Sequence, residues 1–224
     1  MYNKVLSGIL IVLLIAIIIT LGCLGYGYFT KYNNEKSAEK YLAEEFDTLI
    51  VDLNEQTTDV DNPEQQNNDN ANNQNNTNKP KKNTNTSPAA YYKGYKVAGK
   101  IEMPTIGKQF PILDEPQKAK AMEVSVVKVY GPDLNTPGNA VIGGHNYNNG
   151  TFFSRNKKLN VGDKIFITDM TGKRVEYRIF NKYYCPESDS TWFNRKSDGK
   201  TEVTLYTCDA TGANRLIVCA RAVE

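Results

Sequence analysis

Three residue types that together support nucleophilic catalysis lie near the ends of predicted strands. Cys208 ends the strand-like segment TEVTLYT and begins the turn DATGAN, where a thiol is accessible to a substrate. Arg215 opens the next strand-like segment, so a β-hairpin would hold its guanidinium beside the sulfur. His145 follows the segment NAVIGG and is the only histidine, so any acid/base role for an imidazole falls to it. The pattern predicts a thiol nucleophile with an acid/base and a stabiliser of negative charge.

The other cysteines fit this role less well. Cys23 lies in a long apolar run, and Cys219 lies inside the strand-like segment RLIVCARAV, where a buried apolar side chain is expected. Cys185, in YYCPES, follows a strand into a loop and is the main rival of Cys208. A disulfide between Cys185 and Cys219 is an alternative in an oxidising exterior. We expect free thiols, because a nucleophile must stay reduced.

Several of these segments resemble the sortase family. TLYTC, which ends at Cys208, and the Arg215 that begins RLIVCAR resemble the sortase pattern TLxTC with a downstream arginine. VIGGHNY, which contains His145, resembles the strand-terminal GH of the family, and IEMPTIGKQFPIL and LNVGDKIFI are also similar to sortase segments. The resemblance covers about residues 97–224.

The resemblance implies a membrane-bound cysteine transpeptidase. In this interpretation Cys208 attacks a peptide carbonyl in the C-terminal sorting signal (LPxTG-like) of a surface protein and forms a thioester. His145 protonates the leaving amine, and Arg215 holds the substrate backbone and the developing oxyanion. An amine of a peptidoglycan precursor or of a pilin then accepts the acyl group. Thr207 and Asn146 are candidate substrate-binding residues, although they could equally be a strand former and a turn residue.

Two other functions stay open at this point. A hydrolytic cysteine peptidase would use the same dyad and let water resolve the thioester, and a non-catalytic wall-binding β-domain would carry an inert thiol. The sortase subclass (A, B or D-like) is unresolved, although no DPW-like or DPF-like lid motif precedes the domain. We predict no required cofactor and no metal site, because Asp114, Glu115 and Asp133, the candidate calcium ligands, are no better than solvated charges.

The segment 91–224 predicts the fold. Short runs rich in Val, Ile, Tyr and Thr, such as VAGKIEM, MEVSVVKVY, DKIFITD and KRVEYRIF, are separated by turn signals such as PDLNTPGN and SDGK. The fold class is therefore all-β, and the resemblance implies a closed sortase-type barrel of about eight strands. One or two short helices are expected, one of them at residues 116–122.

The N-terminal part predicts a membrane anchor. Residues 5–24 carry no charge over 20 residues, enough to cross a hydrocarbon core of about 30 Å. A cleaved signal peptide is the alternative, but no clear cleavage site follows. Basic residues flank the span almost evenly, so they leave its orientation open. We expect residues 1–4 to be a cytoplasmic tail, and the enzyme to be a single-pass protein of the cell membrane with its catalytic domain outside.

Two segments separate the anchor from the barrel. Residues 25–54 are predicted to form a juxtamembrane amphipathic helix that serves as a stalk or packs on the domain, because residues 35–54 have apolar side chains at three-to-four-residue spacing. Residues 55–90, rich in Asn and Gln, predict a disordered linker that would give the enzyme reach above the membrane. The 27 basic and 25 acidic residues are evenly mixed, which argues against nucleic acid as a partner.

Overall fold

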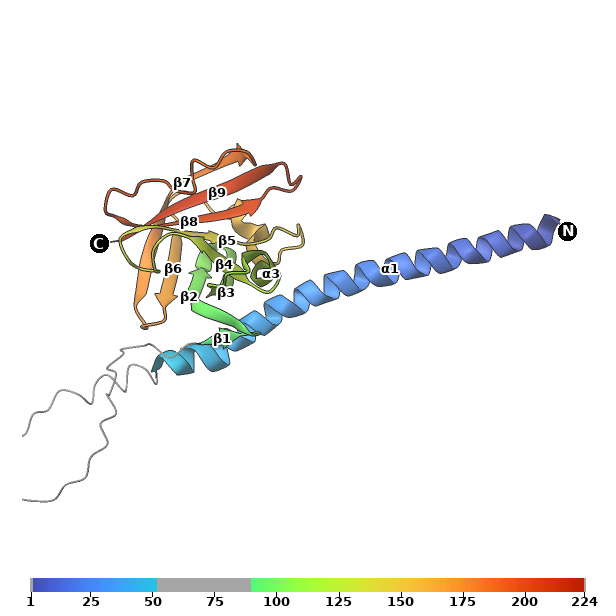
Figure 1. Ribbon diagram of the computed structural model, residues 1–224, viewed down its shortest axis with the longest axis horizontal. Coiled ribbons are helices and arrows are strands. Elements are labelled where there is room, and N and C mark those ends of the chain that lie inside the picture. The colour runs from blue at the N-terminus through green and yellow to red at the C-terminus, as the bar shows by residue number, and fades with distance from the viewer. Residues whose placement is uncertain (1, 52–89, 224) are drawn as a thin grey trace, which may run out of the picture.

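The computed structural model describes residues 2–51 and 90–223, and in them a β-barrel sits against one end of a long helix (Figure 1). The strands are β1 (Tyr91–Tyr92), β2 (Tyr95–Met103), β3 (Lys108–Leu113), β4 (Val126–Tyr130), β5 (Gly138–Gly143), β6 (Lys164–Asp169), β7 (Arg174–Pro186), β8 (Thr201–Cys208) and β9 (Asn214–Ala222). They hydrogen-bond in the order β1-β2-β3-β4-β5-β8-β9-β7-β6, and β6 returns to pair with β2. This pairing closes the barrel and confirms the predicted all-β class.

The barrel interior is filled by side chains from alternate positions of the strands. The side chains that pack there with no exposed surface include Ile101, Phe110, Ile142, Ile167 and Leu205. Strands β5 and β8 are buried on both faces, because the segment 187–200 covers the outer face of this part of the barrel. Trp192 of this segment is 7% exposed and packs against Tyr206 of β8 in a tilted arrangement, with ring centroids 4.8 Å apart.

Short helices lie between the strands: α3 (Lys118–Met122) and the 3-10 helices η2 (Pro104–Ile106) and η3 (Phe152–Lys158). Helix α3 confirms the helical turn predicted at residues 116–122. The strand predicted over MEVSVVKVY is shorter than expected, because Met122 ends α3 and pairing begins only at Val126. Strand β3 contains Pro111, which pairs with β2 and lies before the two residues that pair with β4. The proline therefore does not interrupt that ladder.

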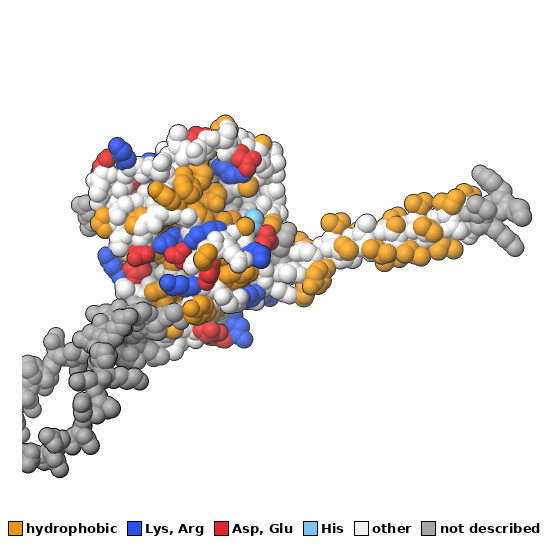
Figure 2. Space-filling model, viewed as in Figure 1, with side chains coloured by type: hydrophobic (Ala, Val, Ile, Leu, Met, Phe, Trp, Pro, Cys, Tyr) orange, Lys and Arg blue, Asp and Glu red, His pale blue; other side chains and the backbone are white. Residues whose placement is uncertain are grey.

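The N-terminal helix continues past the predicted anchor without a break. Helix α1 (Tyr2–Tyr41) is followed by a π-helical turn η1 (Leu42–Phe46), and helical backbone extends to Val51. The most apolar window of this helix has a mean hydropathy of 2.9. Figure 2 shows hydrophobic side chains on the part of α1 that projects away from the barrel. The helix thus continues from the predicted anchor, residues 5–24, into the segment predicted as a juxtamembrane helix.

The C-terminal part of this helix packs on the barrel. Ala38, Leu42 and Phe46 are buried in an apolar cluster that also contains Ala90, Tyr92, Val97, Leu113 and Val127 of the barrel. Glu35 forms an ion pair with Lys108 of β3, and both side chains are nearly buried. The Nζ of Lys100 lies 2.6 Å from Oδ1 of Asp47. The predicted amphipathic helix is therefore a packing helix, bound to the domain that follows it.

This contact changes the interpretation of the predicted linker. Residues 55–89 lie outside the described residues, but Ala90, placed in the linker by the sequence, is 5% exposed and accepts a hydrogen bond from the amide of Val97. The helix before the linker and the chain after it share one apolar cluster. The structure thus holds the barrel against the helix through residues on either side of the segment 52–89.

Candidate active site

The strand pairing brings the three predicted site residues to one row. Strands β5 and β8 are parallel, with Gly143 opposite Tyr206, so His145 and Cys208 each lie two residues further along neighbouring strand ends. Strands β8 and β9 are antiparallel, with Cys208 opposite Arg215. Side chains opposite each other in a sheet lie on the same face. One end of the barrel thus collects a thiol, a guanidinium and an imidazole.

The two glycines before His145 make room for aromatic side chains. A Cβ added at Gly143 would lie 2.5 Å from the ring of Tyr206, and one at Gly144 would lie 2.7 Å from the ring of Phe153. A glycine, which has no Cβ, allows another group to approach the backbone closely. The structure shows the close approach and assigns it to protein side chains, which fix the strand end that carries the imidazole.

His145 has a carboxylate neighbour. Its Nε2 lies 3.2 Å from Oε1 of Glu123, the residue after α3. This nitrogen is buried, and among the described residues it has no contact with the geometry of a hydrogen bond. The ring of Tyr147 stacks on the imidazole at 5.0 Å, and its hydroxyl donates to Oε2 of Glu123 at 2.8 Å. Burial, and then the Glu123 carboxylate, raises the pKa of Tyr147, which keeps this donor protonated.

Arg215 is held at the turn between β8 and β9. Its Nη2 donates to Oε1 of Glu187, and its Nη1 donates to the carbonyl oxygens of Gly212 at 3.0 Å and Asn214 at 3.3 Å. A guanidinium has five N–H groups. Among the described residues three of them are used, which leaves two for a substrate on the face shared with Cys208.

Cys208 is half-buried and borders a small hollow of about 70 Å³. Thr207, the preceding residue of β8, also borders it, is 2% exposed, and its hydroxyl has no hydrogen-bond partner within the described part of the chain. Asn146 donates from Nδ2 to the carbonyl of Cys208 at 2.9 Å and accepts at Oδ1 from the amide of Asn148. The amide of Asn146 therefore ties the loop after His145 to the strand that carries the thiol.

The remaining cysteines are placed as poor nucleophiles. Cys185 was expected in a loop, but it lies in β7 opposite Arg215 and is 6% exposed. Cys219 is 1% exposed within β9. Burial is the main cause that raises the pKa of both thiols. All four cysteines are free thiols, so the alternative disulfide between Cys185 and Cys219 is absent.

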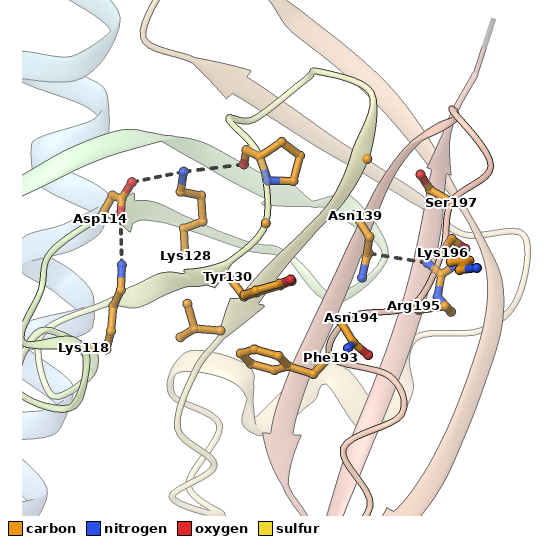
Figure 3. A pocket seen from close by; sticks show the side chains of 14 residues that line it. Asp114, Lys118, Lys128, Tyr130, Asn139, Phe193, Asn194, Arg195, Lys196 and Ser197 are labelled. Carbon is orange, nitrogen blue, oxygen red and sulfur yellow. Dashed lines mark hydrogen bonds and ion pairs between the residues drawn. The ribbon is translucent and has the colours of Figure 1, made fainter.

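A larger cleft lies apart from these residues. It has a volume of about 690 Å³ and lies between the β4–β5 hairpin and the segment that contains Phe193 and Arg195 (Figure 3). Asp114, one of the candidate calcium ligands, faces this cleft, and its carboxylate bonds to Lys118 at 2.7 Å and to Lys128 at 3.1 Å. Burial by itself would raise the pKa of Asp114, but the two ammonium groups together outweigh burial and lower the pKa. Despite its size, the cleft holds none of the predicted catalytic groups.

The other candidate calcium ligands are also engaged within the protein. Glu115 accepts a hydrogen bond from the amide of Lys96, and Asp133 lies 3.4 Å from Nζ of Lys128. Within residues 2–51 and 90–223, no three side chains of His, Cys, Asp or Glu converge on one point. The carboxylates named above thus serve lysines and backbone amides.

Comparison with known proteins identifies the family. A family model described as the Sortase domain matches residues 101–223, more than half of the chain. No curated protein matches the chain. The chain belongs to the sortase family. It is accordingly a cysteine transpeptidase that acts on the sorting signals of surface proteins, as the motifs implied.

Solved structures with the same fold include three classes of sortase. A lid mutant of sortase A from Corynebacterium diphtheriae is 28% identical, with a TM-score of 0.50 over 57% of this chain and 70% of that one. A sortase D5 transpeptidase from Clostridium perfringens is 28% identical, with a TM-score of 0.52 over 57% of this chain and 79% of that one. Sortase C1 from Streptococcus agalactiae, at 21% identity and a TM-score of 0.51 over 57% and 69% of the two chains, shares the fold. The subclass therefore stays unresolved.

Proposed function

We propose that Cys208 is the nucleophile, His145 the acid/base and Arg215 the oxyanion-stabilising group of this transpeptidase. The observation that carries the proposal is the pairing of parallel β5 with β8 and of antiparallel β8 with β9, which sets Cys208 opposite Arg215 and brings the end of β5, two residues before His145, beside β8. Cys208 is also the only cysteine of the barrel that is not buried. A reactive thiol needs this combination of access and neighbouring charge.

The reaction follows from these groups in two steps. The sulfur of Cys208 bonds to the carbonyl carbon of the sorting signal while the free N–H groups of Arg215 face the developing oxyanion. The carbon–nitrogen bond then breaks, His145 gives its proton to the leaving amine, and a thioester remains. In the second step an incoming amine attacks the thioester, His145 takes the proton of that amine, and the sulfur leaves as the thiolate, which restores the thiolate and imidazolium with which the first step began. We propose a peptidoglycan precursor or a pilin lysine as the source of the amine.

We further propose that α1 anchors the enzyme in the cell membrane through residues 5–24, with residues 1–4 in the cytoplasm and the barrel outside. The length and apolar surface of this part of α1 support the anchor. The outward orientation follows from the position of sorting signals and wall amines, which a sortase must reach.

The test measures the intact mass of the full chain in detergent micelles, as wild type, Cys208→Ala and Cys219→Ala. Each is incubated with LPxTG-like or NPxTN-like peptides, with and without an amine. Wild type and Cys219→Ala should gain an acyl adduct, and the amine should convert it into a new amide. Cys208→Ala should gain none. An adduct on Cys208→Ala would refute the assignment, and an adduct that only water resolves would identify a hydrolytic peptidase.

A further inference from the structure

The proposed acid/base His145 has a charged neighbour from another part of the fold. We infer that Glu123 is a positioning residue for His145: its carboxylate fixes the proton on Nε2 and leaves Nδ1 as the nitrogen that exchanges protons with the substrate. The inference rests on the proposed function for the role of His145. It deepens that function by naming the group that controls which ring nitrogen does the work.

The contacts of the Glu123 carboxylate support this role. Its two oxygens face the imidazole of His145 at 3.2 Å and the hydroxyl of Tyr147 at 2.8 Å. The Tyr147 ring in turn stacks on the imidazole at 5.0 Å, 29° from parallel. The carboxylate therefore lies at the edge of the imidazole and the phenol ring lies against its face.

The Glu123 carboxylate favours one of the two tautomers of the neutral His145 ring. A neutral imidazole carries its proton on one nitrogen, and the environment decides which one. A negative oxygen 3.2 Å from Nε2 favours a proton on that nitrogen. The lone pair then lies on Nδ1, which can accept the proton of the incoming amine, while the doubly protonated ring can give a proton to the leaving amine.

The backbone of Glu123 is fixed from the opposite side by helix α1. Its carbonyl accepts a hydrogen bond from Nδ2 of Asn34 at 3.1 Å. Asn34 is itself held by the hydroxyl of Tyr92, which donates to its carbonyl at 3.2 Å, and by Nζ of Lys93, which donates to its Oδ1 at 2.8 Å. The juxtamembrane helix thus supports the residue that faces the imidazole.

A purely structural role would leave Glu123 dispensable as a charge. The side chain is 62% exposed, so it fills no core space. Glutamine has nearly the same shape, and its amide oxygen can still accept from Tyr147. Glu123→Gln therefore removes the charge and little else. Glu176→Gln is a matched control, because the Glu176 carboxylate also contacts two partners, Lys164 and Arg178. Glu176 lies near the start of β7, whereas the part of β7 that pairs with Arg215 is at its end.

The first measurement uses the single histidine. With ¹⁵N-labelled histidine in the full chain in detergent micelles, all ring-nitrogen signals of the folded protein come from His145. At pH 8 wild type and Glu176→Gln should show the pattern of the Nε2–H tautomer. Glu123→Gln should show a mixture of the two tautomers. An identical pattern in wild type and Glu123→Gln would overturn the inference, whatever the enzymatic activity.

The second measurement is the kinetics of transpeptidation with an LPxTG-like peptide and an amine. Glu123→Gln should lower kcat about fivefold with little change in KM, the size expected for loss of a partly exposed charge contact. Asn34→Ala, which leaves the charge in place but frees the backbone, should lower kcat by less. Unchanged kcat in Glu123→Gln, or an equal loss in Glu176→Gln, would refute the role of the carboxylate.

The two measurements also separate this inference from the proposed function. If wild type forms no adduct on Cys208 with any peptide, the proposed function fails, and the tautomer pattern still decides whether Glu123 controls His145. If wild type is active and the tautomer pattern does not respond to Glu123→Gln, the proposed function stands and the inference fails.

Discussion

Removal of the Phe46 ring tests whether helix and barrel form one folded unit. Phe46 is 1% exposed in the cluster shared by α1 and the barrel, and the Nζ of Lys100 lies 5.6 Å from its ring centre. Truncation of a buried Phe to Ala typically costs about 3–5 kcal/mol. With a urea slope of about 2 kcal/mol/M for a domain of this size, the unfolding midpoint of Phe46→Ala should fall by about 1.5–2.5 M.

The assay is urea unfolding of the full chain in detergent micelles, followed by the fluorescence of Trp192. Trp192 is the only tryptophan and lies on the barrel, away from the helix contact, so it reports on the barrel itself. Val51→Ala is the control, because Val51 is on the same helical segment and is 53% exposed. Its midpoint should change by less than the equivalent of about 0.5 kcal/mol. An unchanged midpoint in Phe46→Ala would show that the barrel folds without the helix.

Three more predictions concern the active-site end of the barrel. At pH 8, iodoacetamide should label the half-buried Cys208 at least about tenfold faster than Cys219, whose pKa is raised by burial, and denaturation should remove the difference, as peptide mass mapping will show. Glu187→Gln should change the KM for peptide by less than about fivefold, because the Glu187 side chain, which pairs with Arg215, is 68% exposed. A larger change would contradict the expectation that this exposed ion pair contributes little. Side-chain hydrogen bonds lower the pKa of Asp209 to about 2, below the ordinary value of about 3.9. Its carboxylate therefore stabilises the fold above pH 4 and loses this effect as the pH falls to 2, so the Tm of Asp209→Asn should decline less than that of wild type over this range; parallel declines would refute this.

The sequence named candidate site residues but did not show how they come together. The turn residues between the two strand-like segments predicted that Cys208 and Arg215 flank a hairpin. This was possible because the two strands that pair are neighbours in the sequence. The position of His145 beside them depends on parallel pairing of β5 with β8, whose contacts join residues about 60 positions apart. Periodicity within a strand carries no information on which distant strand it joins. The resemblance to sortases supplied what the pattern could not.

Two other features were missed for physical reasons. Glu123 follows a five-residue helix with no motif around it, and its role depends on contacts with two residues of a distant loop. Cys185 was expected in a loop, since Pro186 follows it. In the structure the last residues of β7 pair only with β9, and within the described residues their other edge has no neighbouring strand. A proline at this strand end therefore removes no hydrogen bond to a second strand. In both cases the tertiary partner decides, and the local sequence does not name it.

The docking of α1 also sets how the chain between helix and barrel can vary. Ile50 and Ala90 both contact the apolar cluster of the barrel, so residues 52–89 need only connect two points of one surface. The entropy of closing such a connection grows slowly, by about 0.6 kcal/mol for each doubling of its length. The barrel instead approaches the helix near the end of the proposed span, where Tyr147 and Asn149 line a hollow together with Cys23 and Leu24. Insertions and deletions in the Asn-rich segment can therefore accumulate while the height of the catalytic thiol above the lipid stays constant.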